Sequence, residues 1–301
     1  MPQLRFAFLL LSAALFHGQD LPKFKADSTL VLIPVSVTEH SNRFVLGLRK
    51  QDFQILEDGV EQKIVNLSGE DAPLSIGLLY DRSGSMGEKQ QTSRQAASQF
   101  LKTMNTADEA FLVDFADEAE VAQGFTSRPE DLDSKLALLQ PGGLTALLDA
   151  VHLGFREMKN GRNPRKALLI ISDGGDNHSR YSAKEIQGLV READVQIYAM
   201  GVFEALGPLG MSLEEQRGPR LLSNISEQTG GRAFAASRLD QLPEVAARIA
   251  VELRNQYMLA FSPLNQAKDG TYRKLEVKLA QPDGMTGLAA RWRLGYYAPA
   301  K

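Results

Sequence analysis

The chain has 301 residues, of which 43% are apolar and 24% are charged, and its formal net charge is −3. This balance is typical of a globular protein and leaves room for two domains. The basic residues form no stripe along the sequence, so nucleic acid is excluded as an expected partner. Because the chain contains no cysteine, we expect neither disulfide bonds nor a lipid anchor on a cysteine.

The start of the sequence has the pattern of an export signal. Residues 1–18 carry one basic residue, Arg5, followed by an apolar run over residues 6–16. That run is too short to span a bilayer but fits the apolar region of a secretory signal peptide. We expect residues 1–18 to be a signal peptide, no transmembrane segment after it, and a periplasmic or secreted bacterial protein. The alternative is a disordered apolar start on a cytosolic chain.

Residues 27–70 are predicted to be an N-terminal β segment. Apolar and alternating runs predict strands at residues 30–37, 44–46, 53–57 and 60–65. The pair Asp58-Gly59 lies between the last two of these strands and is a strong hairpin signal.

Between residues 73 and 255 the pattern changes to alternating strands and helices, which predicts an α/β fold. Strands are expected at residues 74–80, 110–115, 121–125, 167–171, 195–202 and 233–235, with 121–125 at an edge. Helices are expected around residues 96–104, 132–139, 145–158, 182–190, 221–230 and 243–255, and Ser182 with Glu185 forms a capping box. The fold class is therefore a Rossmann-like, mostly parallel sheet flanked by helices.

Residues 256–299 return to β structure, with strands expected at 257–261, 272–279 and 288–294. Neither end of the chain could bury much apolar surface by itself. Together the two ends supply six or so short strands, which is enough for a small β-sandwich-like domain. We therefore expect this C-terminal β segment to pair with the N-terminal one.

One stretch of the α/β region carries the chemistry. The buried strand at residues 74–80 ends in a loop in which Asp81, Ser83 and Ser85 stand at alternate positions, and Gly84 and Gly87 make the backbone pliable. One carboxylate and two hydroxyls form an all-oxygen set. Such a set suits a hard cation such as Mg²⁺, Mn²⁺ or Ca²⁺ and suits zinc or copper poorly.

The segment Asp81-Arg82-Ser83-Gly84-Ser85 resembles the D-x-S-x-S signature of von Willebrand factor A domains, the first loop of their metal-ion-dependent adhesion site. In that family a threonine from a second loop and an aspartate from a third loop complete the site. Here Thr145 follows the glycine turn at residues 141–144, and Asp173 ends the strand-like run at residues 168–172. The resemblance thus implies a metal site made of Asp81, Ser83, Ser85, Thr145 and Asp173. With the β segments and the terminal stretch 291–299, the resemblance to bacterial VWFA-related proteins covers nearly all of the mature chain.

The resemblance also implies a function. Two carboxylates and three hydroxyls, with waters, leave the cation short of negative charge, so an Asp or Glu carboxylate from a protein partner can replace a water. Such a site binds proteins and performs no chemistry, so we expect a binding module and no enzyme. The alternative is a metal-assisted hydrolase that uses the same Asp and Ser pocket.

Other interpretations of these motifs remain open. Asp81, Ser83 and Ser85 could simply start a helix by capping its free N–H groups. Asp176 is expected to shape the third loop through its backbone and not to bind metal, and His178 is expected to be a surface imidazole. Residues 203–220 are expected to form a long loop that contains Glu214 and Glu215. That loop is either solvated surface, or one of the two glutamates reaches the metal as an internal ligand.

Overall fold

The structure is a computed structural model that describes residues 30–41, 43–69, 72–203, 213–236, 238–280 and 287–300. Residues 1–18, the predicted signal peptide, lie outside the described residues. Within the described part of the chain, no helix is long and apolar enough to cross a membrane.

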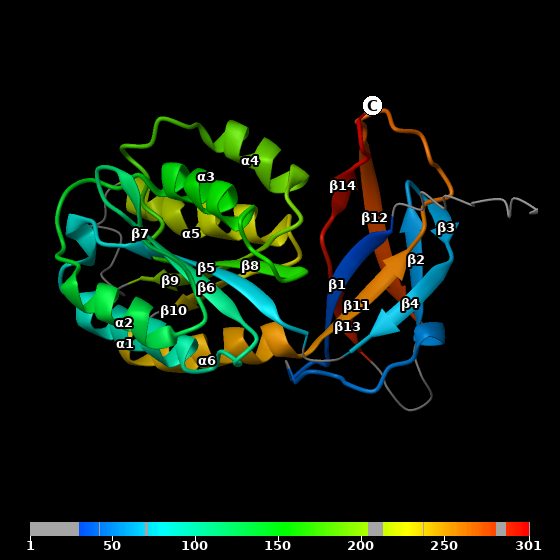
Figure 1. The fold of residues 1–301 in the computed structure, drawn as a ribbon, viewed down its shortest axis with the longest axis horizontal. Coiled ribbons are helices and arrows are strands. Elements are labelled where there is room, and N and C mark those ends of the chain that lie inside the picture. Colours follow the sequence, from blue (N-terminus) through cyan, green and yellow to red (C-terminus); the bar gives the residue numbers. More distant parts are fainter. Residues whose placement is uncertain are drawn as a thin grey trace, which may run out of the picture.

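A six-stranded sheet forms the centre of the larger domain (Figure 1). Its strands are β5 (Leu74–Asp81), β6 (Glu109–Phe115), β7 (Ala119–Thr126), β8 (Arg165–Ser172), β9 (Gln196–Val202) and β10 (Ala233–Ala236). The spatial order is β10-β9-β8-β5-β6-β7, and every neighbouring pair is parallel except β6 and β7. The predicted mostly parallel sheet is confirmed, and β7 lies at its edge as expected.

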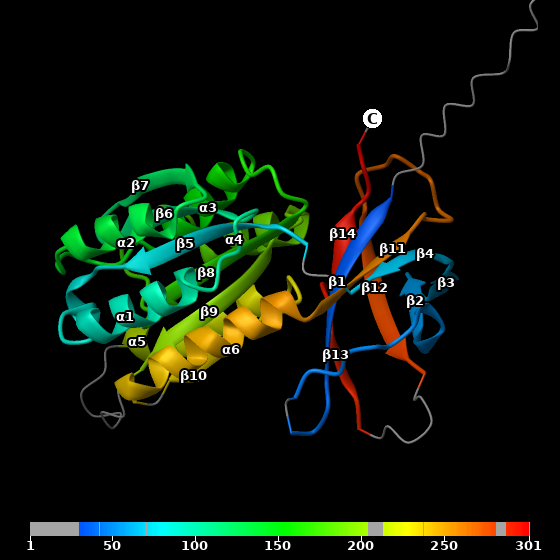
Figure 2. The same cartoon turned by 60° about the horizontal axis from the view of Figure 1, so that its bottom comes forward.

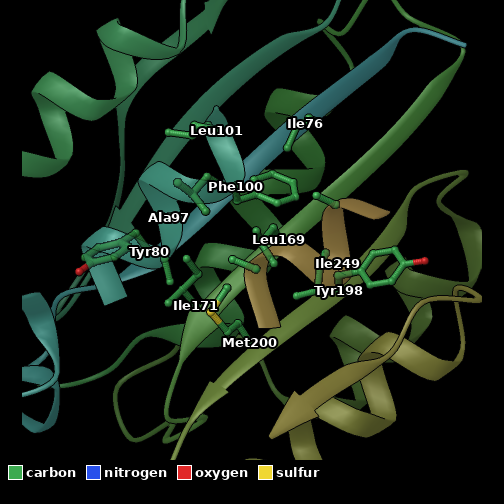
Figure 3. Packing of buried hydrophobic residues seen from close by; sticks show 14 of the residues in the cluster. Ile76, Tyr80, Ala97, Phe100, Leu101, Leu169, Ile171, Tyr198, Met200 and Ile249 are labelled. Carbon is green, nitrogen blue, oxygen red and sulfur yellow. The ribbon is translucent and has the colours of Figure 1, made fainter. Parts of the chain in front are cut away.

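Helices cover both faces of this sheet (Figure 1). One face carries α1 (Gln90–Leu101), α2 (Pro129–Leu138) and α6 (Leu242–Arg254), and the other carries α3 (Leu147–Met158), α4 (Ala183–Glu192) and α5 (Leu213–Glu227). All eight residues of β5 are buried, which explains the continuous apolar run in its sequence. Figure 3 shows the core under α1 and α6, where Phe100 and Ile249 pack near Leu169 of β8.

The two ends of the chain build a second, smaller domain (Figure 2). Its strands are β1 (Val31–Thr38), β2 (Phe53–Glu57), β3 (Val60–Gln62), β4 (Ile64–Ser68), β11 (Gln256–Phe261), β12 (Tyr272–Leu279), β13 (Ala289–Arg291) and β14 (Gly295–Tyr297). They form the sheets β13-β1-β11-β4 and β14-β12-β2-β3, in which β1 pairs antiparallel with β11 and β2 with β12. Apolar side chains from both ends share one core. The β-sandwich-like domain expected from the N- and C-terminal segments is therefore present.

The structure corrects several element predictions. The expected strand at 60–65 is divided into β3 and β4, which belong to different sheets, and the expected strand at 288–294 is likewise divided between β13 and β14. Only Phe44 of the expected strand 44–46 makes a bridge, to Thr38. The prediction of a loop over residues 203–220 is wrong for its second half, because α5 begins at Leu213. Residues 204–212 lie outside the described residues.

Candidate metal centre

The first loop follows the carboxyl end of β5. The Asp81 side chain is fully buried, and its Oδ1 accepts the Ser83 N–H at 2.9 Å. The hydroxyl oxygens of Ser83 and Ser85 lie 3.2 Å apart. Ser83 precedes the short helix η2 (Gly84–Met86) without capping it, and the residue that precedes α1 is Lys89. The helix-capping interpretation therefore does not explain why hydroxyls stand at positions 83 and 85.

The second loop is held against the first by backbone hydrogen bonds. The Gly142 N–H donates to Arg82 O at 2.8 Å, and the Gly84 N–H donates to Gly143 O at 3.0 Å. Gly143 has φ of +82°, and a Cβ there would lie 2.3 Å from an Asp117 carboxylate oxygen. The glycine turn is thus required by both conformation and space. It delivers Thr145, which is 5% exposed, to the edge where the first loop lies.

The third loop follows the carboxyl end of β8, the direct neighbour of β5. Ser172 donates its hydroxyl to Asp81 Oδ2 at 2.6 Å, and the next residue is the buried Asp173. Gly174 has φ of +79° and packs backbone against backbone on Gly218 of α5, where a Cβ on Gly218 would lie 2.4 Å from Asp173 O. Helix α5 therefore limits how the backbone of residues 173–174 can be placed.

The second and third loops are joined through Thr145. Its N–H donates to Asn177 Oδ1 at 2.9 Å, and its carbonyl accepts the Asn177 N–H at 3.0 Å. Asp176 was expected to shape this loop through its backbone, but the contact is made by its side chain, whose Oδ1 accepts the Leu148 N–H at 3.2 Å. His178 is exposed, as expected for a surface imidazole.

The site contains two neighbouring carboxylates, those of Asp81 and Asp173, and one paired ammonium group, that of Lys89. Burial, and after it the neighbouring Asp173 carboxylate, raises the pKa of Asp81 to about 7, even though Ser172 and Ser83 donate hydrogen bonds to it. Lys89 forms an ion pair with Asp173, with Nζ 3.0 Å from Oδ2. The nearby guanidinium of Arg82 is paired with Asp114 instead. Two buried carboxylates thus lie near each other, and one ammonium group, that of Lys89, pairs with Asp173.

These residues have the chemistry of a hard divalent-cation site. The donors are carboxylate and hydroxyl oxygens, and the like-charged pair of Asp81 and Asp173 is only partly neutralised, by the Lys89 ammonium on Asp173. Among the described residues, no cluster of three or more His, Cys, Asp or Glu has the arrangement of a metal site. A cation here would therefore depend on the hydroxyls of Ser83, Ser85 and Thr145 as well as on the two carboxylates.

Sequence reasoning missed Ser172, Asn177 and Lys89. Ser172 and Asn177 flank the predicted ligand Asp173 in the third loop, and polar residues beside a ligand commonly orient it. Lys89 had a weaker signal, because a basic residue at a helix N-terminus opposes the helix dipole and needs an acidic partner. The side chains of Glu214 and Glu215 lie outside the described residues, so the internal-ligand hypothesis stays a prediction.

Comparisons with known proteins bear on this domain. Residues 76–175 match the family model of the von Willebrand factor type A domain, a range that contains the first two loops and the start of the third loop, with Asp173. A comparison with curated proteins finds no match.

Three solved structures illustrate the similarity in fold. Proximal thread matrix protein 1 from the mussel byssus has a TM-score of 0.52 and 20% identity, over 66% of this chain and 51% of that one. The von Willebrand factor domain of the type V pili tip protein Mfa5 from Porphyromonas gingivalis has a TM-score of 0.50 and 13% identity, over 60% and 95%. The conserved hypothetical protein BatB from Bacteroides thetaiotaomicron has a TM-score of 0.48 and 17% identity, over 60% and 98%. The family match and the fold together support a protein that contains a von Willebrand factor type A domain.

Proposed function

We propose that this protein is a divalent-cation-dependent protein-binding module. Asp81, Ser83, Ser85, Thr145 and Asp173 would hold Mg²⁺, or Mn²⁺ or Ca²⁺ in its place. The observation that supports the proposal is that Asp81 and Asp173 are buried near each other and the Ser83 and Ser85 hydroxyls lie 3.2 Å apart, while backbone hydrogen bonds join the loop of Thr145 to the other two loops. When bound, the cation supplies an electrophilic position for an Asp or Glu carboxylate of a protein partner.

The residues of the loops explain why a partner carboxylate is favoured. The hydroxyls of Ser83, Ser85 and Thr145 donate oxygen without adding negative charge, so only Asp81 and Asp173 neutralise a divalent ion. Ser85 is exposed, whereas Asp81 is fully buried, so the site is open on the side of the first loop. A partner would therefore approach over Ser85.

The names of two similar structures agree with a binding role. One is a pilus tip protein and the other is a matrix protein of a byssus thread. We extend that role to this chain as a non-enzymatic interaction module. We also propose that the chain is exported, because residues 1–18 have the pattern of a signal peptide.

Calorimetric titration with Mg²⁺ tests the metal site. We expect wild-type protein to bind Mg²⁺ and Asp81→Asn to lose at least about a hundredfold in affinity, because a ligand is removed while the side-chain volume is kept. Asp108→Asn is the matched control, since Asp108 is equally buried but lies at the opposite end of the sheet. Equal Mg²⁺ affinity in wild type and Asp81→Asn would refute the proposed metal site.

A pull-down from an envelope extract of the producing organism tests the binding role. Wild-type protein should retain partners in Mg²⁺ and release them in EDTA, whereas Asp81→Asn should retain none in either condition. Assays with generic ester and phosphate substrates should show no turnover. Metal-dependent turnover that disappears in Asp81→Asn would instead favour the hydrolase alternative.

A further inference from the structure

Lys89 occupies an unusual position beside the candidate metal centre. Its Nζ lies 3.0 Å from Asp173 Oδ2, and the two side chains are only 12% and 4% exposed. The contact joins the first loop region to the third loop across 84 positions of sequence. A pair so little exposed is weakly screened by salt, so it is stronger than an ordinary surface ion pair.

The backbone of Lys89 is fixed by the same turn that carries the first-loop donors. Its N–H donates to Met86 O at 3.0 Å, and its carbonyl accepts the Ser93 N–H at 3.0 Å, at the start of α1. A positive charge is unfavourable at a helix N-terminus. Asp173 offsets that cost, so the ion pair explains how a lysine is accommodated there.

We propose that the Lys89 ammonium is a tethered competitor of the divalent cation for Asp173, and that it sets the metal affinity of the site. This inference rests on the proposed metal-dependent function. In the absence of metal, Lys89 neutralises Asp173 and reduces the repulsion between Asp173 and Asp81. Binding of a cation through Asp173 requires this ammonium to leave the Oδ2 oxygen. The free energy of the lost ion pair then opposes binding and lowers the affinity for the cation.

The side chain of Lys89 suits such an exchange. A lysine ammonium is a point charge on a flexible four-carbon stem, so it can leave one carboxylate and reach water without a change in the backbone. Because it is covalently tethered near Asp173, its effective concentration is far above that of any free monovalent cation. Half-occupancy of the site would therefore need a higher concentration of divalent metal than it would without Lys89.

The test compares Mg²⁺ affinities by calorimetry in full-length protein. Lys89→Met removes the charge and keeps an unbranched stem, so Mg²⁺ should bind at least about tenfold more tightly than to wild type, the factor expected for loss of a competing charge-assisted hydrogen bond. Lys89→Arg keeps the charge and should stay closer to wild type. Unchanged or weaker Mg²⁺ binding in Lys89→Met would overturn the inference.

Arg82→Gln is the matched control for long-range electrostatics. Arg82 lies in the same loop and carries the same charge, but it is paired with Asp114. Direct competition predicts a much larger gain in affinity for Lys89→Met than for Arg82→Gln. Equal gains in the two variants would mean that net charge, and no specific exchange at Asp173, controls the affinity.

A second measurement uses wild-type protein alone. Labelling of amines, followed by mass spectrometry, should be slow at Lys89 without metal and should accelerate when Mg²⁺ is added, whereas the exposed Lys102 should react equally in both conditions. Labelling of Lys89 that slows or stays constant while calorimetry shows Mg²⁺ binding would reject the exchange but leave the metal site intact. Absence of Mg²⁺ binding in wild type and in Lys89→Met would reject both the proposed function and this inference.

Discussion

Buried acidic residues lie at both ends of the strands of the central sheet. They are more completely paired at the amino end than at the carboxyl end. At the amino end, Asp108 accepts the Leu74 N–H at 2.8 Å and the Asn105 N–H at 2.7 Å, and it pairs with Arg254. At the carboxyl end, Asp81 and Asp173 lie near each other, and among the described ion pairs Lys89 pairs with Asp173 and not with Asp81.

The pKa values of the acidic residues also differ between the two ends of the sheet. At the amino end, burial acts to raise the pKa of Glu109, but hydrogen bonds from the Arg162 N–H and from Ser75, together with the Arg162 guanidinium, outweigh burial and lower it. At the carboxyl end, burial and Asp173 raise the pKa of Asp81 to about 7. Carboxylates that are fully paired are expected to stabilise the fold, whereas the incompletely paired set is the candidate functional site. The following predictions test that contrast.

The largest effect on stability is expected at the amino end. Arg254→Met leaves the Asp108 carboxylate, whose side chain is 0% exposed, without its cation. We expect the free energy of unfolding to fall by about 3 kcal/mol, the lower end of the cost of breaking a buried pair, because two backbone hydrogen bonds to Asp108 remain. Urea unfolding followed by circular dichroism measures this change. Mg²⁺ affinity should stay that of wild type, and a parallel loss of Mg²⁺ binding would show that the two ends are not independent.

A smaller effect is expected where α5 supports the third loop. A Cβ at position 218 would meet the backbone of Asp173 and Gly174, so Gly218→Ala must displace the loop. We expect a loss of about 1–3 kcal/mol in stability, as for other overpacked sites, and also weaker Mg²⁺ binding in calorimetry.

Gly188→Ala provides the control for this prediction. Position 188 lies inside α4 with no atom within 4 Å of an added Cβ, so alanine should be neutral or stabilise by up to about 1 kcal/mol. Mg²⁺ binding should be unaffected there. If Gly218→Ala binds Mg²⁺ as wild type does, α5 does not position Asp173.

The smallest effect on stability is expected for Asp81→Asn in metal-free buffer. The substitution removes one of two neighbouring buried carboxylates while an amide oxygen can still accept the Ser83 N–H. We therefore expect a thermal unfolding midpoint in EDTA equal to or above that of wild type. A strongly lowered midpoint would place Asp81 among the structural carboxylates, like Asp108.

Much of this fold follows from local sequence pattern. Continuous apolar runs predicted β5 and β8, and the neighbouring glycines predicted the loops after them. Alternation of apolar and polar residues cannot show that a chain changes sheet, which is why the predicted strand at 60–65 missed the division between β3 and β4.

Tertiary contacts explain the other differences. Gly218 belongs to the segment 203–220 that was predicted to be a loop, yet it lies within α5, where it allows the helix to approach Gly174. Asp81, Ser83 and Ser85 could be proposed as donors because they stand two residues apart in one loop. Lys89 could not be assigned to Asp173, because no spacing rule connects residues so distant in sequence.

Crystals of wild-type protein soaked in Mn²⁺ give the most direct test of the central claim, that the three loops at the carboxyl end of the sheet bind a divalent cation. Mn²⁺ is directly located by anomalous scattering. We predict one strong peak in contact with oxygens of Asp81, Ser83, Ser85, Thr145 and Asp173 or their bound waters, with Lys89 Nζ no longer bonded to Asp173. Lys89 still paired with Asp173 at saturating Mn²⁺, with no peak between the three loops, would contradict it.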